Sequence, residues 1–228
     1  MVLSVKPLSQ IESKIRLLVY GDVGTGKTTF AANSPNPVIL DYENSTETLR
    51  KTHPDIPVIK SLRDLGNFER VLQFVQKPPD EYDTIIFDTV STMNYRMLQY
   101  HMQNKVSGRD QHIALYQDFR KMTNVLREIF LALIDCPKNV IVCAHADFRI
   151  DDETNRVLEV RPTLPPKARE AIEQLINEVF YIEVDPGLKD IKRNFYVNPT
   201  KKIIAKNRRG ISEIKLANPT WSEIYNAS

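Results

Sequence analysis

The chain has 228 residues and a formal net charge of +2 at pH 7, from 31 Lys and Arg against 29 Asp and Glu. This length suffices for one large α/β domain with a substantial core, and the balanced charge excludes a polycation, so any affinity for nucleic acid must be local. No apolar run approaches the about 18 residues of a membrane-spanning helix, and residues 1–12 lack the apolar segment of a signal peptide. We therefore expect a soluble, cytoplasmic protein without a membrane partner.

The two cysteines point to the same kind of compartment. Cys136 and Cys143 lie in or beside apolar segments, at a spacing that does not match metal ligands. We expect buried, reduced thiols and no disulfide framework.

A glycine-rich segment follows the first apolar run, which is predicted to form a buried strand over residues 15–20. The segment that follows this strand matches the pattern G-x-x-x-x-G-K-[ST] at four positions, Gly21, Gly26, Lys27 and Thr28. Glycines let successive backbone N–H groups face a phosphate, and the helix that follows adds its positive amino end. The alternative, a glycine-rich turn that binds nothing, is disfavoured by the strand in front.

The pattern predicts a bound nucleoside triphosphate, ATP, together with Mg²⁺. Lys27 is expected to reach the β- and γ-phosphates, and the Thr28 hydroxyl is expected to bind Mg²⁺. The residues expected to surround the nucleotide are Gly21, Asp22, Val23, Gly24, Thr25, Gly26, Lys27, Thr28 and Thr29.

Beyond this loop, apolar strands and amphipathic helices alternate. Strands are expected at 38–40, 84–88 and 139–144, and helices at 28–32, 65–75, 91–103 and 112–133. A polar loop at 104–110 separates the last two helices. This alternation predicts a parallel sheet with helices on both faces and ligands at the carboxyl ends of the strands.

The last third of the chain has a different pattern. A hairpin is expected across residues 148–160, a helix at 167–177 and a strand at 179–184. Short antiparallel strands are expected at one edge of the sheet, at 195–198, 203–206 and 212–216. Since no segment has the composition of a linker, we expect residues 1–228 to form a single domain.

Two acids at strand ends are candidates for the chemistry. Asp88 fits the Walker B position, where an acid holds the Mg²⁺ shell together with Thr28. Thr89 and not a glutamate follows it, so a water-activating base must lie elsewhere, and Glu43 is the best candidate. Asp88 could instead be an ordinary acid at the end of a strand, and Glu43 could be a solvated acid in a loop.

Two segments resemble strands of RecA-like P-loop ATPases. The sequence V-I-L-D-Y-E at residues 38–43 resembles the strand whose final glutamate polarises the attacking water. The sequence V-I-V-C-A-H at residues 140–145 resembles the strand whose terminal polar residue senses the γ-phosphate, although relatives often carry Gln there. The resemblance implies that Glu43 is the base and that His145 reports the γ-phosphate to a DNA-binding loop.

A third segment, K-N-R-R-G at residues 206–210, resembles the K-x-R ribbon of hexameric RecA-like ATPases of the DnaB type. That resemblance implies that Lys206 and Arg208 stabilise charge on a neighbouring subunit's γ-phosphate. It also implies a homo-oligomer with nucleotide at the subunit interface. The alternative is a basic hairpin tip in solvent or on nucleic acid.

Single-stranded DNA is the partner that the resemblance implies. RecA-like proteins bind it through two loops, which correspond here to residues 103–111 and 148–167. The second loop carries four basic and four acidic residues, so a structural hairpin is nearly as compatible. Residues 189–209 carry eight basic residues and one acid, a run that is usually solvated but that could attract a phosphate backbone.

Across nearly the whole chain, the order of motifs is similar to small bacteriophage RecA-like ATPases that act in single-strand annealing or recombination. The resemblance implies a RecA-like P-loop core: a mostly parallel twisted sheet flanked by helices, with antiparallel strands at the C-terminal edge. It also implies DNA-stimulated ATP hydrolysis, in the host cytoplasm if the chain is phage-encoded. Two other classes remain open: an ATP-switched DNA-loading or regulatory assembly protein with little turnover, and a small-molecule kinase.

Overall fold

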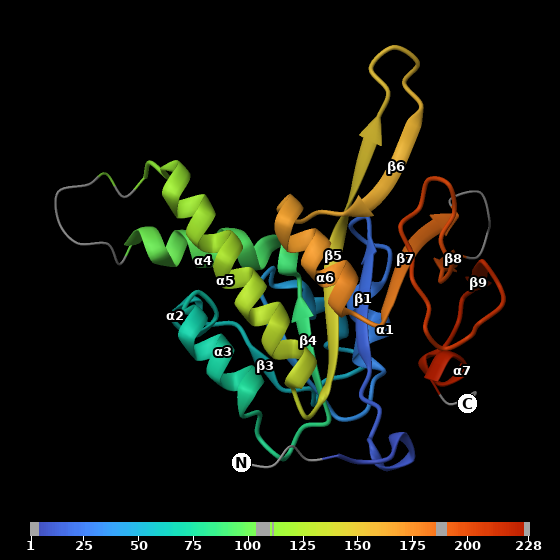
Figure 1. The fold of residues 1–228 in the computed structure, drawn as a ribbon, viewed down its shortest axis with the longest axis horizontal. Coiled ribbons are helices and arrows are strands. Elements are labelled where there is room, and N and C mark those ends of the chain that lie inside the picture. Colours follow the sequence, from blue (N-terminus) through green and yellow to red (C-terminus); the bar gives the residue numbers. More distant parts are fainter. Residues whose placement is uncertain (1–4, 104–109, 111, 186–190, 226–228) are drawn as a thin grey trace.

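A computed structural model describes residues 5–103, 110, 112–185 and 191–225 of the chain. In this described part, nine strands form one sheet with the order β3-β2-β4-β5-β1-β7-β8-β9, and β6 pairs with β5 beside that path (Figure 1). The strands are β1 Arg16–Gly21, β2 Pro37–Asp41, β3 Val58–Ile59, β4 Thr84–Asp88, β5 Asn139–Ile150, β6 Val157–Pro162, β7 Glu178–Asp185, β8 Lys192–Tyr196 and β9 Lys215–Ala217.

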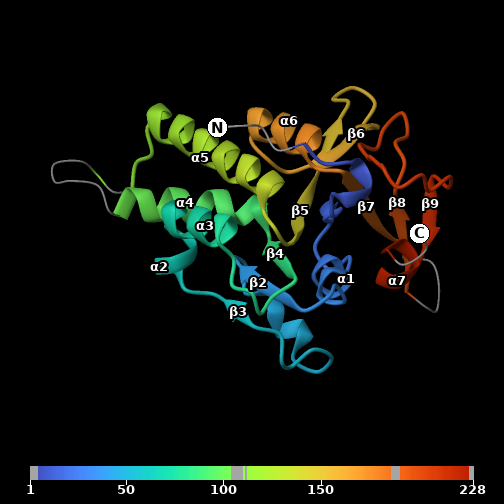
Figure 2. The ribbon, with the colours of Figure 1, turned by 60° about the horizontal axis from the view of Figure 1, so that its bottom comes forward.

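Helices cover both faces of the sheet (Figure 2). They are α1 Lys27–Ala32, α2 Leu62–Leu65, α3 Phe68–Gln76, α4 Val90–Gln103, α5 Tyr116–Asp135, α6 Pro166–Leu175 and α7 Trp221–Tyr225, with 3₁₀ turns at Leu8–Gln10 and Ser45–Leu49. Helices α3 to α6 lie on one face, and α1 and α7 lie on the other. Among the described helices, none combines the length and apolarity needed to cross a bilayer.

Neighbouring strands along the path β3-β2-β4-β5-β1-β7 pair in parallel, whereas β7, β8 and β9 pair antiparallel at one edge. The apolar runs of the sequence become these parallel strands because both faces of each strand are covered by helices. The predicted fold class, a mostly parallel sheet flanked by helices with antiparallel strands at its C-terminal edge, is confirmed.

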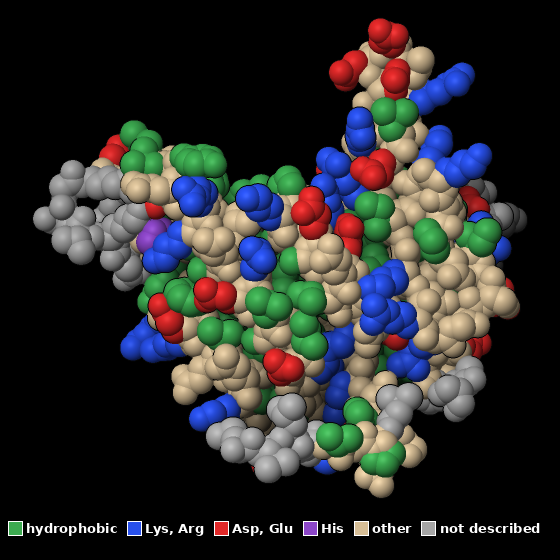
Figure 3. Space-filling model, viewed as in Figure 1, with side chains coloured by type: hydrophobic (Ala, Val, Ile, Leu, Met, Phe, Trp, Pro, Cys, Tyr) green, Lys and Arg blue, Asp and Glu red, His purple; other side chains and the backbone are tan. Residues whose placement is uncertain are grey.

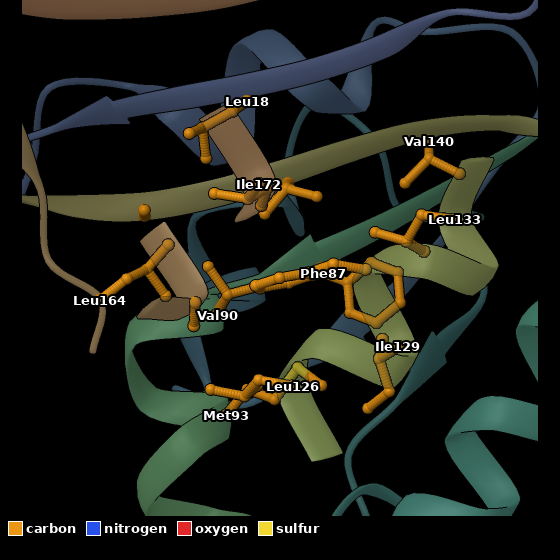
Figure 4. Packing of buried hydrophobic residues seen from close by; sticks show 14 of the residues in the cluster. Leu18, Phe87, Val90, Met93, Leu126, Ile129, Leu133, Val140, Leu164 and Ile172 are labelled. Atoms are coloured by element: carbon orange, nitrogen blue, oxygen red, sulfur yellow. The ribbon is translucent and has the colours of Figure 1, made fainter. Parts of the chain in front are cut away.

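Side chains of the parallel strands alternate between two cores. Leu18 and Tyr20 of β1 contribute to the core under α3, α4, α5 and α6, whereas Leu17 and Val19 contribute to the core under α1 and α7. Figure 4 shows the first of these cores, in which Phe87 of β4 packs against α5. Because two layers of helices hold the sheet, the carboxyl ends of its strands are placed rigidly.

Several predicted boundaries were wrong. The predicted strands at 139–144 and 148–150 are one continuous strand, β5, which leaves the sheet after His145 and pairs with β6. Residues 203–206 form only two isolated bridges, Val160 with Ile203 and Val179 with Lys206, because this segment crosses from β6 to β7. Strand β9 begins at Lys215, later than predicted.

Several short elements were missed, β3 and α7 among them, and most of one predicted loop is outside the described residues. Strand β3 has two residues, and helix α7 has five, both too short for a periodic signal. Nearly all of the predicted polar loop at 104–110 lies outside the described residues. Cys136 and Cys143 are both free and buried, as expected.

Candidate functional site

The loop between β1 and α1 has a shape that requires glycine. Gly24 and Gly26 adopt positive φ angles of 79° and 94°, a region that side chains rarely enter. A Cβ on Gly21 would lie 2.4 Å from the carbonyl oxygen of Ile182 in β7. Helix α1 begins at Lys27 directly after this loop, so its positive amino end faces the loop. Such a terminus attracts anions.

Lys27 is the buried cation of this loop, with 5% of its surface exposed. Its Nζ donates hydrogen bonds to the carbonyl oxygens of Gly21, at 2.9 Å, and Asp22, at 2.7 Å. Burial lowers the pKa of Lys27 from its ordinary value, and the nearby carboxylates Asp88 and Glu43 act in the opposite direction. A cation among backbone N–H groups at a helix amino end is suited to phosphate.

Asp88 ends β4 beside this loop and is 1% exposed. Its Oδ2 accepts hydrogen bonds from Thr28 Oγ1 at 2.7 Å and Ser45 Oγ at 2.5 Å. Its Oδ1 is buried without a hydrogen-bond partner among the described residues. Burial raises the pKa of Asp88, and the Ser45 and Thr28 hydroxyls act in the opposite direction.

These residues fit Mg²⁺ as it usually occurs beside phosphates. Mg²⁺ takes oxygen ligands, often one or two protein groups plus phosphate oxygens and water. The Thr28 hydroxyl and the unpartnered Oδ1 of Asp88 supply such groups. Within the described residues there is no cluster of three His, Cys, Asp or Glu that could hold a metal alone. Phosphates would therefore have to complete the coordination.

Glu43 lies at the centre of a hydrogen-bond network, with its side chain 21% exposed. Its Oε1 accepts from His145 Nε2 at 2.6 Å, from Thr89 Oγ1 at 2.5 Å and from Thr92 Oγ1. Burial alone would raise the pKa of Glu43, but the hydrogen bonds from His145, Thr89 and Thr92 outweigh it and lower the pKa to about 2. Glu43 is therefore a carboxylate at neutral pH.

Asp41, two residues earlier, shapes the turn that carries Glu43. Its Oδ1 accepts from the backbone N–H groups of Glu43 and Ser45, both at 3.1 Å, and its Oδ2 accepts from Thr46 Oγ1 at 2.7 Å. Burial opposes ionisation of Asp41, yet these hydrogen bonds lower its pKa. Asp41 thus positions both Glu43 and Ser45.

His145 connects this network to the β5–β6 hairpin. It is the last residue of β5 that pairs with β1, opposite Gly21. Its backbone N–H donates to Ser91 Oγ at 3.0 Å, and Ser91 Oγ donates to the carbonyl of Thr163 at 2.9 Å. The Nδ1 of His145 is buried without a partner among the described residues. A movement of His145 would therefore displace the base of the hairpin.

The structure brings Lys27, Thr28, Glu43, Asp88 and His145 together at the carboxyl edge of the sheet. Three hydroxyls that donate to Asp88 and Glu43 were not predicted from the sequence; they belong to Ser45, Thr89 and Thr92. Serine and threonine after a strand are too common to stand out in a single sequence. Only the folded chain shows that they are hydrogen-bond donors to carboxylates.

Lys206 and Arg208 lie elsewhere. Lys206 pairs with Val179 at the amino end of β7, and its Nζ donates to the carbonyls of Glu173, Gln174 and Ile176, at 2.8, 3.1 and 2.7 Å. Arg208 Nη1 donates to Asn177 Oδ1 at 3.1 Å. Within this chain, neither residue contacts the loop at 21–28 in the described structure. Their role on a neighbouring subunit stays a prediction.

Together, the sheet order, the glycine loop and the helix that follows it have the form of a P-loop domain with a RecA-like fold. The sequence model of the AAA domain family matches residues 13–209, so the chain belongs to that family. An AAA-type, RecA-like fold supports nucleotide-hydrolysing activity.

A solved structure shares this fold at low sequence identity. A KaiC-like protein from Pyrococcus horikoshii OT3 is 16% identical, with a TM-score of 0.53 over 88% of this chain and 83% of that one. The RadB recombinase (14%, TM-score 0.49, 89% and 86% covered) and FlaH from Methanocaldococcus jannaschii (15%, TM-score 0.44, 89% and 85% covered) are less similar. No curated protein matches the chain in sequence.

Proposed function

We propose that the protein hydrolyses ATP and acts on single-stranded DNA in recombination, annealing or repair, as the small bacteriophage RecA-like ATPases do. The observation that carries the ATPase proposal is the convergence of Lys27, Thr28, Asp88 and Glu43 at one edge of the sheet. We also propose that residues 1–228 form one domain and that the active protein is a homo-oligomer with nucleotide between subunits.

In the proposed mechanism, Lys27 and the loop N–H groups hold the β- and γ-phosphates. Thr28 and Asp88 would hold Mg²⁺, which supplies positive charge to the phosphate oxygens when bound. Glu43 orients the attacking water as a hydrogen-bond acceptor. Its low pKa makes it a weak base, so its role is to position the water more than to remove a proton fully.

A second function is favoured by the same network: an ATP-switched assembly protein with little turnover. Three donors occupy one oxygen of Glu43, and one of them, His145, is joined to the β5–β6 hairpin. The position of the hairpin is thereby coupled, through His145, to the carboxylate that would orient the water. Movement of the hairpin on DNA would then control hydrolysis.

Single-stranded DNA is supported by the charge around the base of the β5–β6 hairpin. Arg149, Lys201 and Lys202 line a groove of 370 Å³ between the hairpin and residues 199–205. The hairpin tip is acidic, whereas Lys and Arg side chains gather below it (Figure 3). Within the described chain, these three side chains have no ion pair, so their charge is available to phosphates.

The deciding experiment is the ATPase rate with and without single-stranded DNA, at 50 and 200 mM salt (about the range over which phosphate contacts weaken). We expect DNA to stimulate turnover, and the stimulation to fall at the higher salt. A charge-reversed variant, Lys201→Glu with Lys202→Glu, should need about tenfold more DNA for the same stimulation. Binding of ATP with negligible turnover under all conditions would support the assembly protein, and transfer of phosphate to a small acceptor would support a kinase.

A further inference from the structure

Ser45, a residue outside the phosphate loop, binds the acid that ends β4. It begins the 3₁₀ turn Ser45–Leu49 after β2, and it is half-buried. Its Oγ donates to Asp88 Oδ2 at 2.5 Å, and Thr28 Oγ1 donates to the same oxygen at 2.7 Å. Asp88 therefore receives two hydroxyl donors, one from the first turn of α1 and one from the turn after β2.

The two carboxylate oxygens of Asp88 differ in their contacts. Both hydroxyls bind Oδ2, whereas Oδ1 is buried without a hydrogen-bond partner among the described residues. The last torsion of an aspartate side chain is soft and roughly two-fold, so a single hydrogen bond would define the orientation of the carboxylate only loosely. A second donor on Oδ2 restricts this rotation, and it leaves Oδ1 as the oxygen that is free for a cation.

Asp41 holds Ser45 in this position. Its Oδ1 accepts from the backbone N–H of Ser45 at 3.1 Å and lies 3.3 Å from Ser45 Oγ, farther than Asp88 does. Strands β2 and β4 pair Asp41 with Asp88, and the N–H of Tyr42 donates to the carbonyl of Asp88 at 2.7 Å. Because the same Oδ1 also accepts from the N–H of Glu43, the Ser45 hydroxyl joins Asp88 to the turn that carries Glu43.

We propose that Ser45 is a positioning residue of the magnesium site, whose hydroxyl fixes the Asp88 carboxylate and leaves Oδ1 free for the metal. The inference rests on the proposed binding of ATP and Mg²⁺. A hydroxyl has one proton and two lone pairs, so Thr28 can keep its hydrogen bond to Asp88 while its oxygen binds the ion. Ser45 acts through Asp88 alone, as the hydrogen-bond partners of metal ligands do.

The test separates the metal from the nucleotide. Calorimetry would measure the affinity for adenylyl imidodiphosphate, an ATP analogue whose β–γ nitrogen bridge resists hydrolysis, first with saturating Mg²⁺ and then in EDTA. The ratio of the two affinities is the gain in binding that the metal provides. Ser45→Ala should lose about tenfold of this gain, because its metal ligand is less well positioned, and should bind the analogue in EDTA as the wild-type protein does.

Matched variants separate the hydroxyl from the turn that carries it. Ser45→Thr keeps a hydroxyl and should keep the gain, whereas Ser45→Val, which has the shape of threonine without the hydroxyl, should lose it. Thr48→Ala removes an exposed hydroxyl that donates to the carbonyl of Ser45 in the same turn, and should change neither affinity. Thr46→Ala removes a donor to Asp41 Oδ2, and should lower the free energy of unfolding while the gain is kept.

The outcomes distinguish this inference from the proposed function. If the wild-type protein binds the analogue neither with Mg²⁺ nor in EDTA, nucleotide binding fails, and the role of Ser45 fails with it. If the wild-type protein shows the gain and Ser45→Ala and Ser45→Val show it in full, the nucleotide site stands and the inference is overturned. An equal loss in Thr46→Ala would also overturn it, because the turn alone would then explain the effect. Binding in EDTA at the wild-type affinity shows that a variant is folded.

Discussion

Two lysines at opposite edges of the sheet make the same kind of hydrogen bond with opposite consequences. Lys27 at the carboxyl edge and Lys206 at the amino edge both donate from Nζ to backbone carbonyls, and burial lowers the pKa of both. Lys27 begins helix α1, however, whereas Lys206 lies at the carboxyl end of α6. A helix amino end attracts phosphate, and a carboxyl end attracts the cation itself.

Arg16 follows the same rule at the amino edge. Its guanidinium donates to the carbonyls of Ile134 and Lys138, at 3.2 and 2.7 Å, and to that of Cys136, all at the carboxyl end of α5. Helices that connect parallel strands run opposite to them, so helix amino ends collect at the carboxyl edge of the sheet. Lys206 and Arg16 thus cap helix carboxyl ends at the amino edge of the sheet, whereas Lys27 lies at a helix amino end at the carboxyl edge, where an anion would be favoured.

The largest expected effect is that of Lys27→Ala. Removal of the ammonium from the loop should lower ATP turnover by at least about a hundredfold, because positive charge on the transferring phosphate is lost. The melting temperature should change little, since loss of the hydrogen bonds to Gly21 and Asp22 is offset by removal of a buried charge. Turnover and thermal unfolding on the same preparation check this, and near-normal turnover would contradict the role given to the loop.

Glu43→Gln comes next. The variant should bind Mg·ATP normally, since the phosphate contacts remain, and hydrolyse it about a hundredfold more slowly because an amide orients water poorly. Calorimetry and phosphate release measure the two quantities. Asp22→Asn, at an exposed acid of the loop at 21–28, is the control for loss of one negative charge. A Glu43→Gln variant with normal turnover would remove Glu43 from the mechanism.

Lys206→Ala tests the amino edge. It leaves the last carbonyls of α6 without their donor, which should cost about 1–3 kcal/mol of the free energy of unfolding, measured in urea. Lys202→Ala, an exposed lysine of the same basic run, is the matched control and should cost little.

The same edge also tests the role in trans. Mixing Arg208→Ala protein with Lys27→Ala protein should restore some turnover if Arg208 completes a neighbour's site. The absence of rescue at every mixing ratio, together with normal turnover of Arg208→Ala alone, would leave the ribbon with only its structural role.

The smallest effect concerns pH. The folded pKa of Glu43, about 2, is below its ordinary value, so its ionisation stabilises the folded protein above the unfolded pKa of about 4.3. That contribution is lost as pH falls toward 2. Between pH 5 and 3, the free energy of unfolding in urea should therefore fall more for the wild-type protein than for Glu43→Gln. Parallel pH profiles of the two proteins would show that the network does not favour the ionised carboxylate.

Much of the fold was predictable because parallel strands buried on both faces are continuous apolar runs. The run at 84–88 is β4 and ends in Asp88, and the run at 139–144 is the first part of β5, which pairs with β4 and leads into His145. The periodicity of hydrophobic residues does not show that a strand continues beyond its parallel neighbours. For this reason β5 was predicted as two separate strands. The partners of Lys206 within the chain could not be predicted either, since they are backbone carbonyls.

By itself, the sequence determined the phosphate loop, the acids at the strand ends and the fold class, because each depends on local spacing or on burial of a short apolar run. Tertiary structure alone decided which cations lie beside the phosphate loop and which cap helices, which hydroxyls bind the acids, and that residues 218–222 lie near the loop. Those features join residues far apart in the chain, as Thr25 and Arg193 are, and only packing of the two helical layers on the sheet brings them into contact.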